Sequence, residues 1–432
     1  MSDSGRVFPD DALRIAGYAN YSAFFDGSQW SSRGQRGETR LTVNYARALL
    51  RKVASYVFSG PVRFAVISDI PNDPLAARAE LALTTTGREN DLDALDPELC
   101  LMASVLGDAA IKVTWDATRA RPVIAAVHPG GLHVTVAPDN PRQLTAVTHV
   151  YHLQPAQAQT LFGALPAAIR SERPLRIQET WTDTSWQVAI EQTVVRAEAN
   201  PYGWIPYDFA TNNARADQFW GESDLVDLID LCRELNSRMS VLSRVLEFSG
   251  APIAVLENVE GADTIRVGPG AMWEIPEGSK AYLLDLLQGG GVRLHIDYIE
   301  LLYRALHDLS ETPRTAFGDS GRPLSGAALE VEIQPLVQKV RRKRQAWERM
   351  HRARNLRILD LLERFGGVDL GGLRATETIW PSVLPSDIDG SVRNAVALVQ
   401  SGIQSRRTAW AALGGLDPDA ELMRIREEAK TE

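Results

Sequence analysis

The chain has 432 residues, with 46 Lys and Arg against 55 Asp and Glu, so its formal net charge is −9 at pH 7. Hydrophobic residues make up 44% and charged residues 23%, a composition typical of globular proteins and not of disordered or fibrous chains. Cys100 and Cys232 are the only cysteines, which excludes a disulfide framework and a cysteine-based zinc site. There is no run of about 18 apolar residues and no apolar core of a signal peptide, so we expect a soluble protein of a reducing, intracellular compartment.

The first 210 residues divide into a helical part and a β part. Apolar residues at helical spacing predict an aromatic-rich helix that contains Tyr18, a second helix over 41–57 and a third over 92–107. The segment 62–68 reads as a short strand. Residues 109–210 then alternate with period two between Pro, Gly, Asp and Asn turns, interrupted by a helical stretch at 155–171, which predicts a mostly antiparallel β region.

From Ser223 the pattern returns to helix. Residues 223–248 form one apolar stripe with Ser223 as N-cap, and a helix of that length would span about 39 Å, which is long for a compact domain. Pro335 is expected to kink or interrupt the last long helix. The further predicted elements are a β-like segment at 251–276, a helix at about 292–311, a loop at 313–325, a helix at about 326–365, a strand within 376–385 and a helical tail at 386–432.

The helix predicted at 326–365 is strongly basic. Between Lys339 and Arg357 nine Lys and Arg stand against Glu348 alone, and the residues singled out as a basic surface are Lys339, Arg341, Arg342, Lys343, Arg344 and Arg349. Such a surface can hold DNA phosphates or pair with acidic residues of a neighbouring subunit, and the sequence leaves both alternatives open. The helix predicted from Ser223 has the opposite charge in its first half, an acidic surface that would repel DNA and so suits a conduit.

Enzyme and metal motifs are weak. The string at Gly318–Pro323 is similar to the nucleophile loop of trypsin-like proteases, but Ser320 stands between two predicted helices, and the family's His-bearing strand motif is absent. His149 and His152 are three residues apart on a predicted strand, so they face opposite sides and do not share a metal easily. No phosphate-binding fingerprint of the Walker A or GxGxxG type is present. We therefore expect no enzymatic activity, no metal and no cofactor.

Five stretches in the same order resemble the portal proteins of tailed bacteriophages, the head-to-tail connector family. They are YANYSAFFDGSQW, TRLTVNYARALLRKVASYVFSGPVRF, GWIPYDFATNN with FWGESDLVDLIDLCRELNSRMS, SGAALEVEIQPLVQKVRRKRQAWE and VALVQSGIQSRRTAWAALGGLDPDAELMRIREE. In the third stretch the matching positions are Pro206, Phe209, Asn212, Gly221, Ser223, Asp224 and Asn236. In the fourth they are Ser325, Gly326, Ala328, Leu329, Pro335, Leu336 and Lys339.

The resemblance implies an α+β portal fold with a mixed α/β wing, a two-helix stem, a small α/β clip, a long kinked helix after a tunnel loop, and a small helical C-terminal crown. The expected parts are a wing over 1–221 and 326–385, stem helices over 222–248 and 292–312, a clip over 249–291, a tunnel loop over 313–325 and a crown over 386–432. Chain length suggests that the crown and the clip are reduced.

The resemblance also implies the function: a non-enzymatic ring, expected to have twelve subunits, at one capsid vertex of the virion, assembled in the host cytoplasm, through which double-stranded DNA passes. The expected partners are the terminase large subunit, head-completion or adaptor proteins, the major capsid protein and scaffold, and no membrane. Residues expected to line the channel at the tunnel loop are Arg314, Thr315, Phe317, Asp319, Ser320 and Arg322. Clip residues expected to contact partners are Glu257, Arg266, Trp273, Glu274 and Lys280.

Two other classes of function stay open at this point. One is a DNA-binding assembly factor without a ring, which would use the helix at 339–357 as its main contact and show a steep salt dependence of DNA affinity. The other is a serine hydrolase with Ser320 as its nucleophile.

Overall fold

The fold is described from a computed structural model, in two units. The structure describes residues 9–29, 40–71, 73–163, 169, 173–250, 253–257, 277–284, 291–319, 326–384, 388–413 and 425. Met1–Ile379 form one unit and Trp380–Glu432 the other. Across the described residues, helices and strands both contribute, so the chain is mixed α+β.

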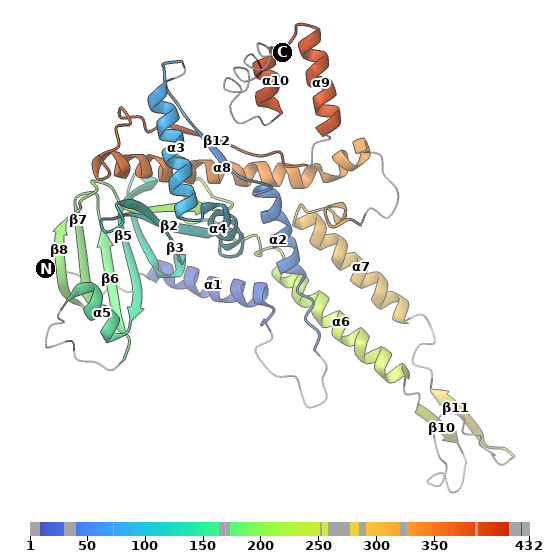
Figure 1. The fold of residues 1–432 in the computed structure, drawn as a ribbon. Coiled ribbons are helices and arrows are strands. Elements are labelled where there is room, and N and C mark those ends of the chain that lie inside the picture. The colour runs from blue at the N-terminus through green and yellow to red at the C-terminus, as the bar shows by residue number, and fades with distance from the viewer. Residues whose placement is uncertain are drawn as a thin grey trace. The chain divides into compact units, whose positions relative to one another are not determined.

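Four helices form the N-terminal part of the first unit: α1 (Pro9–Asp26), α2 (Tyr45–Val57), α3 (Pro74–Glu89) and α4 (Leu92–Leu106) (Figure 1). The side chain of Asn44 accepts a hydrogen bond from the Arg47 N–H at the start of α2, and Asp73 does the same for Leu75 at the start of α3. At the end of α4 the chain turns through Gly107, whose φ of 97° suits a residue without a Cβ. Helices α2 and α4 were predicted, whereas α3 was not, because its Thr run and Gly87 weaken the helical signal.

The β part contains two antiparallel sheets (Figure 1). A three-stranded sheet has the order β3-β2-β9, and a five-stranded sheet runs in chain order from β4 to β8. Their strands are β2 (Asp108–Asp116), β3 (Arg121–Val127), β4 (Leu132–Ala137), β5 (Asn140–Leu153), β6 (Leu175–Trp181), β7 (Ser185–Ile190), β8 (Thr193–Ala199) and β9 (Tyr207–Thr211). A 3-10 turn (Pro129–Gly131) precedes β4, and α5 (Pro155–Phe162) packs on the larger sheet through Ala158. The predicted antiparallel β region is therefore confirmed.

Two helices leave this body side by side, α6 (Ile229–Gly250) and α7 (Gly291–Leu309) (Figure 1). Between them in the chain, β10 (Ile253–Glu257) and β11 (Lys280–Leu284) form an antiparallel pair. The sequence predicted that the first of these helices begins at Ser223, which is wrong: residues 224–228 form turns, and the regular helix begins at Ile229. The β-like segment predicted up to residue 276 lies beyond residue 257 outside the described residues.

A long helix, α8 (Gly326–Arg364), crosses the first unit after the short 3-10 turn η3 (Arg314–Phe317). It is one helix that continues through Pro335, so the predicted interruption there is not found. Its apolar side packs against the body, with Val340, Trp347, Met350, Ile358 and Leu361 buried, while Phe365 just after its end is 40% exposed. Two short strands, β1 (Arg63–Val66) and β12 (Thr376–Ile379), pair antiparallel, and β12 also contacts α8.

One apolar core joins α1, α2 and α4 of the first unit to α6 and α7. It joins Phe24 of α1, Leu49 of α2 and Leu106 of α4 to the base of the α6–α7 hairpin. The hairpin contributes Leu225, Leu228, Ile229, Cys232, Leu235, Ile299, Leu302 and Leu306. Burial of these side chains fixes where the hairpin leaves the body, because apolar burial is the main favourable term in helix packing.

In the second unit, α9 (Ile388–Gln400) and α10 (Arg406–Ala412) contact one another. They enclose an apolar groove between Val396 and Trp410. Of the helical tail predicted at 386–432, residues 388–413 and 425 are described. Across the described part of the chain, every helix is too short or too polar to cross a membrane.

The contact between Gly221 and the end of α4 leaves no room for a side chain. A Cβ on Gly221 would lie 2.2 Å from the Asn212 carbonyl oxygen and 2.4 Å from that of Gly107. Gly221→Ala must therefore displace backbone, and we expect it to lower the free energy of unfolding by about 3 kcal/mol, measured by thermal or urea unfolding. Gly87→Ala on α3 is the matched control: its Cβ meets only Leu92 at 3.8 Å, and we expect a change within about 1 kcal/mol, in the stabilising direction. Equal stability of Gly221→Ala and wild type would contradict the close packing.

Candidate functional site

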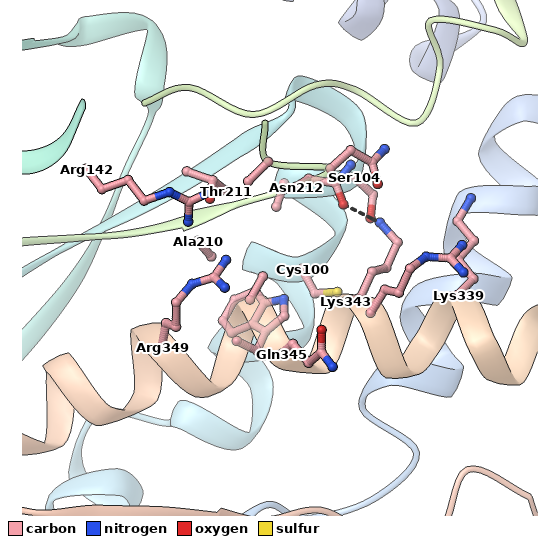
Figure 2. A pocket seen from close by; sticks show the side chains of 16 residues that line it. Cys100, Ser104, Arg142, Ala210, Thr211, Asn212, Lys339, Lys343, Gln345 and Arg349 are labelled. Carbon is pink, nitrogen blue, oxygen red and sulfur yellow. Dashed lines mark hydrogen bonds between the residues drawn. The ribbon is translucent and has the colours of Figure 1, made fainter. Parts of the chain in front are cut away.

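A buried cluster of polar side chains, which we call the Asp224 cluster, lies where the α6–α7 hairpin meets α8. It consists of Ser104, Asn212, Asp224, Lys339 and Lys343. The Lys343 Nζ atom lies 2.5 Å from Asn212 Oδ1 and 3.1 Å from Ser104 Oγ (Figure 2). It also lies 2.7 Å from Asp224 Oδ2. Lys339 lies 3.7 Å from the same carboxylate and donates to the Ser310 carbonyl at 3.0 Å. Asp224 thus stands between two lysines of α8.

Local geometry brings Asp224 into this position. The Ser223 hydroxyl donates to the Val105 carbonyl at 2.5 Å and accepts from the Leu225 N–H at 3.0 Å. The Asp224 N–H donates to the Ser104 carbonyl at 2.9 Å, so the last turn of α4 holds both residues. These contacts explain why the regular helix starts only at Ile229: the predicted N-cap residue is bound to another helix.

The charges of the cluster depend on one another. Burial alone would raise the pKa of Asp224, but Lys343 and Lys339 hold it well below its usual range. Burial lowers the pKa of Lys339, and the Asp224 charge acts in the opposite direction. A carboxylate buried to this degree needs its cations, because an unpaired buried charge costs several kcal/mol.

Two further acids bind α8 along its length. Asp96 of α4 lies 2.6 Å from Arg354 and 3.3 Å from His351. Burial would raise its pKa, but the Arg354 charge and the hydrogen bond with His351 hold it at about 2. Asp208 of β9 forms an ion pair with Arg357. Helix α8 is therefore held to α4, to β9 and to the start of the hairpin by buried charge pairs.

The basic surface predicted on α8 is only partly a surface. Lys339, Lys343 and Arg344 are 7–8% exposed. Arg344 donates to the Val57 carbonyl at 3.0 Å and so satisfies the C-terminal end of α2, and Arg342 pairs with Glu311 at 2.6 Å. The prediction that Lys339, Lys343 and Arg344 belong to a surface for DNA or a neighbouring subunit is wrong, because these side chains are buried and bind backbone carbonyls or Asp224. Arg341, Arg342 and Arg349 are exposed, and contact with DNA or a neighbouring subunit stays a prediction for them.

The tunnel-loop residues are described as far as Asp319. Arg314 and Asp319 form an ion pair at 2.7 Å, both half exposed, and Thr315 lies between them in η3. Phe317 stacks on Tyr45 with ring centroids 6.2 Å apart and packs against the apolar core, so it anchors the base of the loop. Ser320 and Arg322 lie outside the described residues.

The ring of His307 fixes the segment just before this loop. The Tyr45 hydroxyl lies 2.6 Å from His307 Nε2, and His307 Nδ1 lies 2.5 Å from the Thr312 carbonyl oxygen. A carbonyl can only accept, so Nδ1 carries the proton. Both ring nitrogens are thus occupied, which leaves this histidine without a free atom to serve as base for a serine nucleophile.

At the β10–β11 pair, Glu257 and Lys280 stand opposite each other in register. Tyr282 donates to Glu257 at 3.3 Å. The other predicted clip residues, Arg266, Trp273 and Glu274, lie outside the described residues. Among the side chains that the structure describes, no group of three His, Cys, Asp or Glu residues is arranged to hold a metal ion.

Helix α7 carries a second apolar stripe beside the one that faces the core. Its buried stripe is Ile299, Leu302 and Leu306. The exposed fractions in the second stripe are Leu294 71%, Tyr298 40%, Leu301 58% and Leu309 54%. A row of large apolar side chains at helical spacing, left in water over several turns, is typical of a surface that another protein covers.

Asp108 is a fourth buried acid, which the sequence analysis did not predict. Its carboxylate accepts from the Gly221 N–H and from the Tyr18 hydroxyl, both at 2.8 Å. Burial raises its pKa to about 7, and the two hydrogen bonds and the charge of Arg14 only partly offset that effect. Arg14 in turn lies over the Trp220 ring at 3.7 Å, so this group joins α1 to the segment that leads into α6.

The residues of the Asp224 cluster and the other buried acids lie far apart in the sequence. Sequence reasoning matched Asn212, Gly221, Ser223, Asp224 and Lys339 only as motif positions, and the structure brings them together. It missed Asp96, Asp108 and Asp208. The available signal was an acid within an otherwise apolar stretch, as in LDALDPELCLMASVL, where a buried carboxylate implies a cation elsewhere in the chain.

A family model described as phage portal protein, SPP1 Gp6-like, matches residues 31–432 of the chain. No curated protein gives a match. The matched range contains the whole Asp224 cluster, the α6–α7 hairpin and the second unit.

Removing the cation of the Asp224 cluster is expected to cost much more than removing an exposed one. Lys343→Met leaves the buried Asp224 with only the more distant Lys339, so we expect the free energy of unfolding to fall by about 3–5 kcal/mol. Arg341→Met, on the exposed side of the same helix, is expected to change it by no more than about 0.5 kcal/mol. Urea unfolding followed by circular dichroism measures both. Equal effects of the two substitutions would show that the buried pair contributes nothing specific.

The raised pKa of Asp108 predicts a loss of stability with rising pH. In the unfolded chain this carboxyl ionises near 3.8, and in the folded chain near 7, so between these values only the folded state keeps the proton. The folded state therefore loses about 1.4 kcal/mol of stability per pH unit across this range. Asp108→Asn removes this contribution. We expect its stability relative to wild type to rise from pH 4 to pH 7, measured by urea unfolding at each pH. If the difference in unfolding free energy between Asp108→Asn and wild type did not change with pH, the raised pKa of Asp108 would be disproved.

Proposed function

This chain belongs to the phage portal protein family, SPP1 Gp6-like, and on that premise we propose that it forms a closed ring at one vertex of the capsid. The ring has about twelve copies and passes double-stranded DNA during packaging and ejection. The family is structural, so the chain acts by its shape and its contacts.

The observation that carries the proposal is the exposed apolar stripe of α7. A monomer would expose Leu294, Tyr298, Leu301 and Leu309 to water. In a ring, the α6–α7 hairpin of one copy packs against that of the next by a head-to-tail contact, and rotation about the ring axis closes the set. Each stripe is then covered without a second kind of protein.

The charge of the hairpin supports DNA passage. Asp227 and Asp230 near the start of α6 are exposed, and Asp230 forms an exposed ion pair with Arg233 at 2.5 Å. Asp224, predicted to belong to the same acidic surface, is buried and paired instead. The exposed acids disfavour tight binding of phosphates, and a conduit needs DNA to slide. The loop at 313–325, which Phe317 anchors at its base, extends into the bore, with Arg314, Thr315, Asp319, Ser320 and Arg322 along it.

The remaining partners follow from the same role. The β10–β11 region is the docking surface for the terminase large subunit during packaging, and head-completion or adaptor proteins bind there later. Glu257 and Lys280 belong to that surface, together with Arg266, Trp273 and Glu274. The outer part of the ring contacts the major capsid protein and scaffold, and the assembled product is part of the virion.

A DNA-binding factor without a ring is less well supported. That alternative needs the basic helix as an open contact surface. Of its nine cations, Lys339, Arg342, Lys343, Arg354 and Arg357 pair with acids of the same chain. A helix whose charge is mostly used inside the protein is a poor main contact for DNA.

Placing a charge in the α7 stripe tests the ring. Leu301→Asp buries a carboxylate against the next hairpin, so we expect the ring population at a given protein concentration to fall on the order of tenfold or more. Native mass spectrometry and negative-stain images measure it: wild type gives annular particles of about twelve times 47.5 kDa, and the variant gives mostly 47.5 kDa chains.

Leu161→Asp is the matched control, because Leu161 of α5 is 60% exposed but lies away from the hairpin. We expect it to form rings as wild type does. Wild-type protein that stays monomeric, or a Leu301→Asp variant that forms normal rings, would refute the packing that we propose.

A further inference from the structure

A cavity of about 250 Å³ lies between the sheets and α8, next to the Asp224 cluster (Figure 2). Five of its lining side chains are cations: Arg142 of β5 and Lys339, Arg342, Lys343 and Arg349 of α8. Among the described residues that line it, none is acidic. Asp224, which pairs with Lys343, and Glu311, which pairs with Arg342, neutralise two of the five positive charges, so a surplus of three positive charges remains.

Arg142 and Arg349 carry most of that surplus. They come from different elements, and Figure 2 shows the ends of both side chains on the same side of the cavity. Within the described part of the chain, the Arg349 guanidinium has no hydrogen-bond or ion-pair partner. Among the described residues, Arg142 makes one hydrogen bond, from Nη2 to the Arg215 carbonyl at 3.2 Å. Burial lowers the pKa of Arg349, the nearby charges of Arg142 and Arg352 lower it further, and Glu348 acts in the opposite direction. An anion between the two guanidinium groups would relieve the repulsion between their charges.

The other lining groups fit an oxyanion. Thr211, Asn213 and Gln345 add side chains that can donate hydrogen bonds, and the guanidinium fork matches two oxygens of a phosphate group. Inorganic phosphate as a dianion would neutralise two of the three surplus charges, whereas a DNA phosphodiester or a carboxylate from a second copy carries only one negative charge. We propose that this cavity, between Arg142 and Arg349, is a binding site for a phosphate group.

The source of the phosphate is either free inorganic phosphate or a phosphodiester of double-stranded DNA. The site is built within one chain, so it does not depend on ring formation. Phosphate binding and ring assembly are separate measurements, and either can fail while the other succeeds.

The test uses full-length protein and inorganic phosphate. Calorimetric titration at constant ionic strength, with chloride as the compensating salt, measures the dissociation constant. Arg349→Gln and Arg142→Gln each remove one charged donor, so we expect the dissociation constant to rise about tenfold or more. Arg341→Gln, exposed on the same helix but outside the cavity, is the control and should bind as wild type does.

A thermal readout separates binding from structure. Without phosphate, Arg349→Gln should melt at or above the wild-type temperature, because a like charge is removed. With phosphate, wild type should gain stability and the variant should not. A parallel experiment measures binding of a short DNA duplex. If phosphate competes with the duplex and Arg349→Gln weakens duplex binding, the phosphodiester is the source of the phosphate group. If phosphate binds but the duplex does not, the source is free inorganic phosphate. If wild type shows no saturable phosphate binding, or if the cavity variants and Arg341→Gln bind equally, the proposal is overturned.

Discussion

The burial of a basic helix is the constraint on which the first unit depends. A helix with this many cations can cross the middle of a protein only where each buried cation meets a carboxylate or a carbonyl. Asp224, Asp96 and Asp208 provide the carboxylates, and they come from the start of the hairpin, from α4 and from β9. Helix α8 thereby adds buried charge pairs to three elements that also contact one another directly, since Ser223 and Asp224 are hydrogen-bonded to the last turn of α4.

This arrangement explains where the hairpin begins. Asp224 is fixed to Lys343, and Ser223 is fixed to the end of α4, so the chain enters α6 from an anchored point. Gly107 and Gly221 allow the backbones to approach closely there. The same base carries the apolar core, while the outer stripe of α7 is left exposed. Rigid attachment at the base and an uncovered stripe beyond it are what a subunit of a ring needs: the anchor sets the angle of the hairpin, and the stripe meets the next copy.

How much of the fold the local sequence predicts differs from element to element. The antiparallel strands and α2, α4, α7 and α8 could be predicted, because apolar periodicity is local. Helix α3 was not predicted from the sequence, because its buried residues include small side chains such as Ala76 and Ala79. The start of α6 was predicted six residues too early, since Ser223 has the chemistry of an N-cap but is held by the carbonyls of another helix. The basic surface on α8 was overestimated, because charge in a sequence does not say which charges are buried.

The sequence by itself determined the order of the helices and strands, the strongly basic character of residues 339–357 and the resemblance to a portal protein, because these depend on residue types and their spacing along the chain. Only the tertiary structure decided which charges are neutralised, which apolar stripe stays uncovered and which cations gather around an open cavity. Arg354 and Asp96 are 258 residues apart in the chain, and no local pattern links them. The physical reason is that an ion pair acts over a few ångströms of space, whatever the length of chain between its two ends.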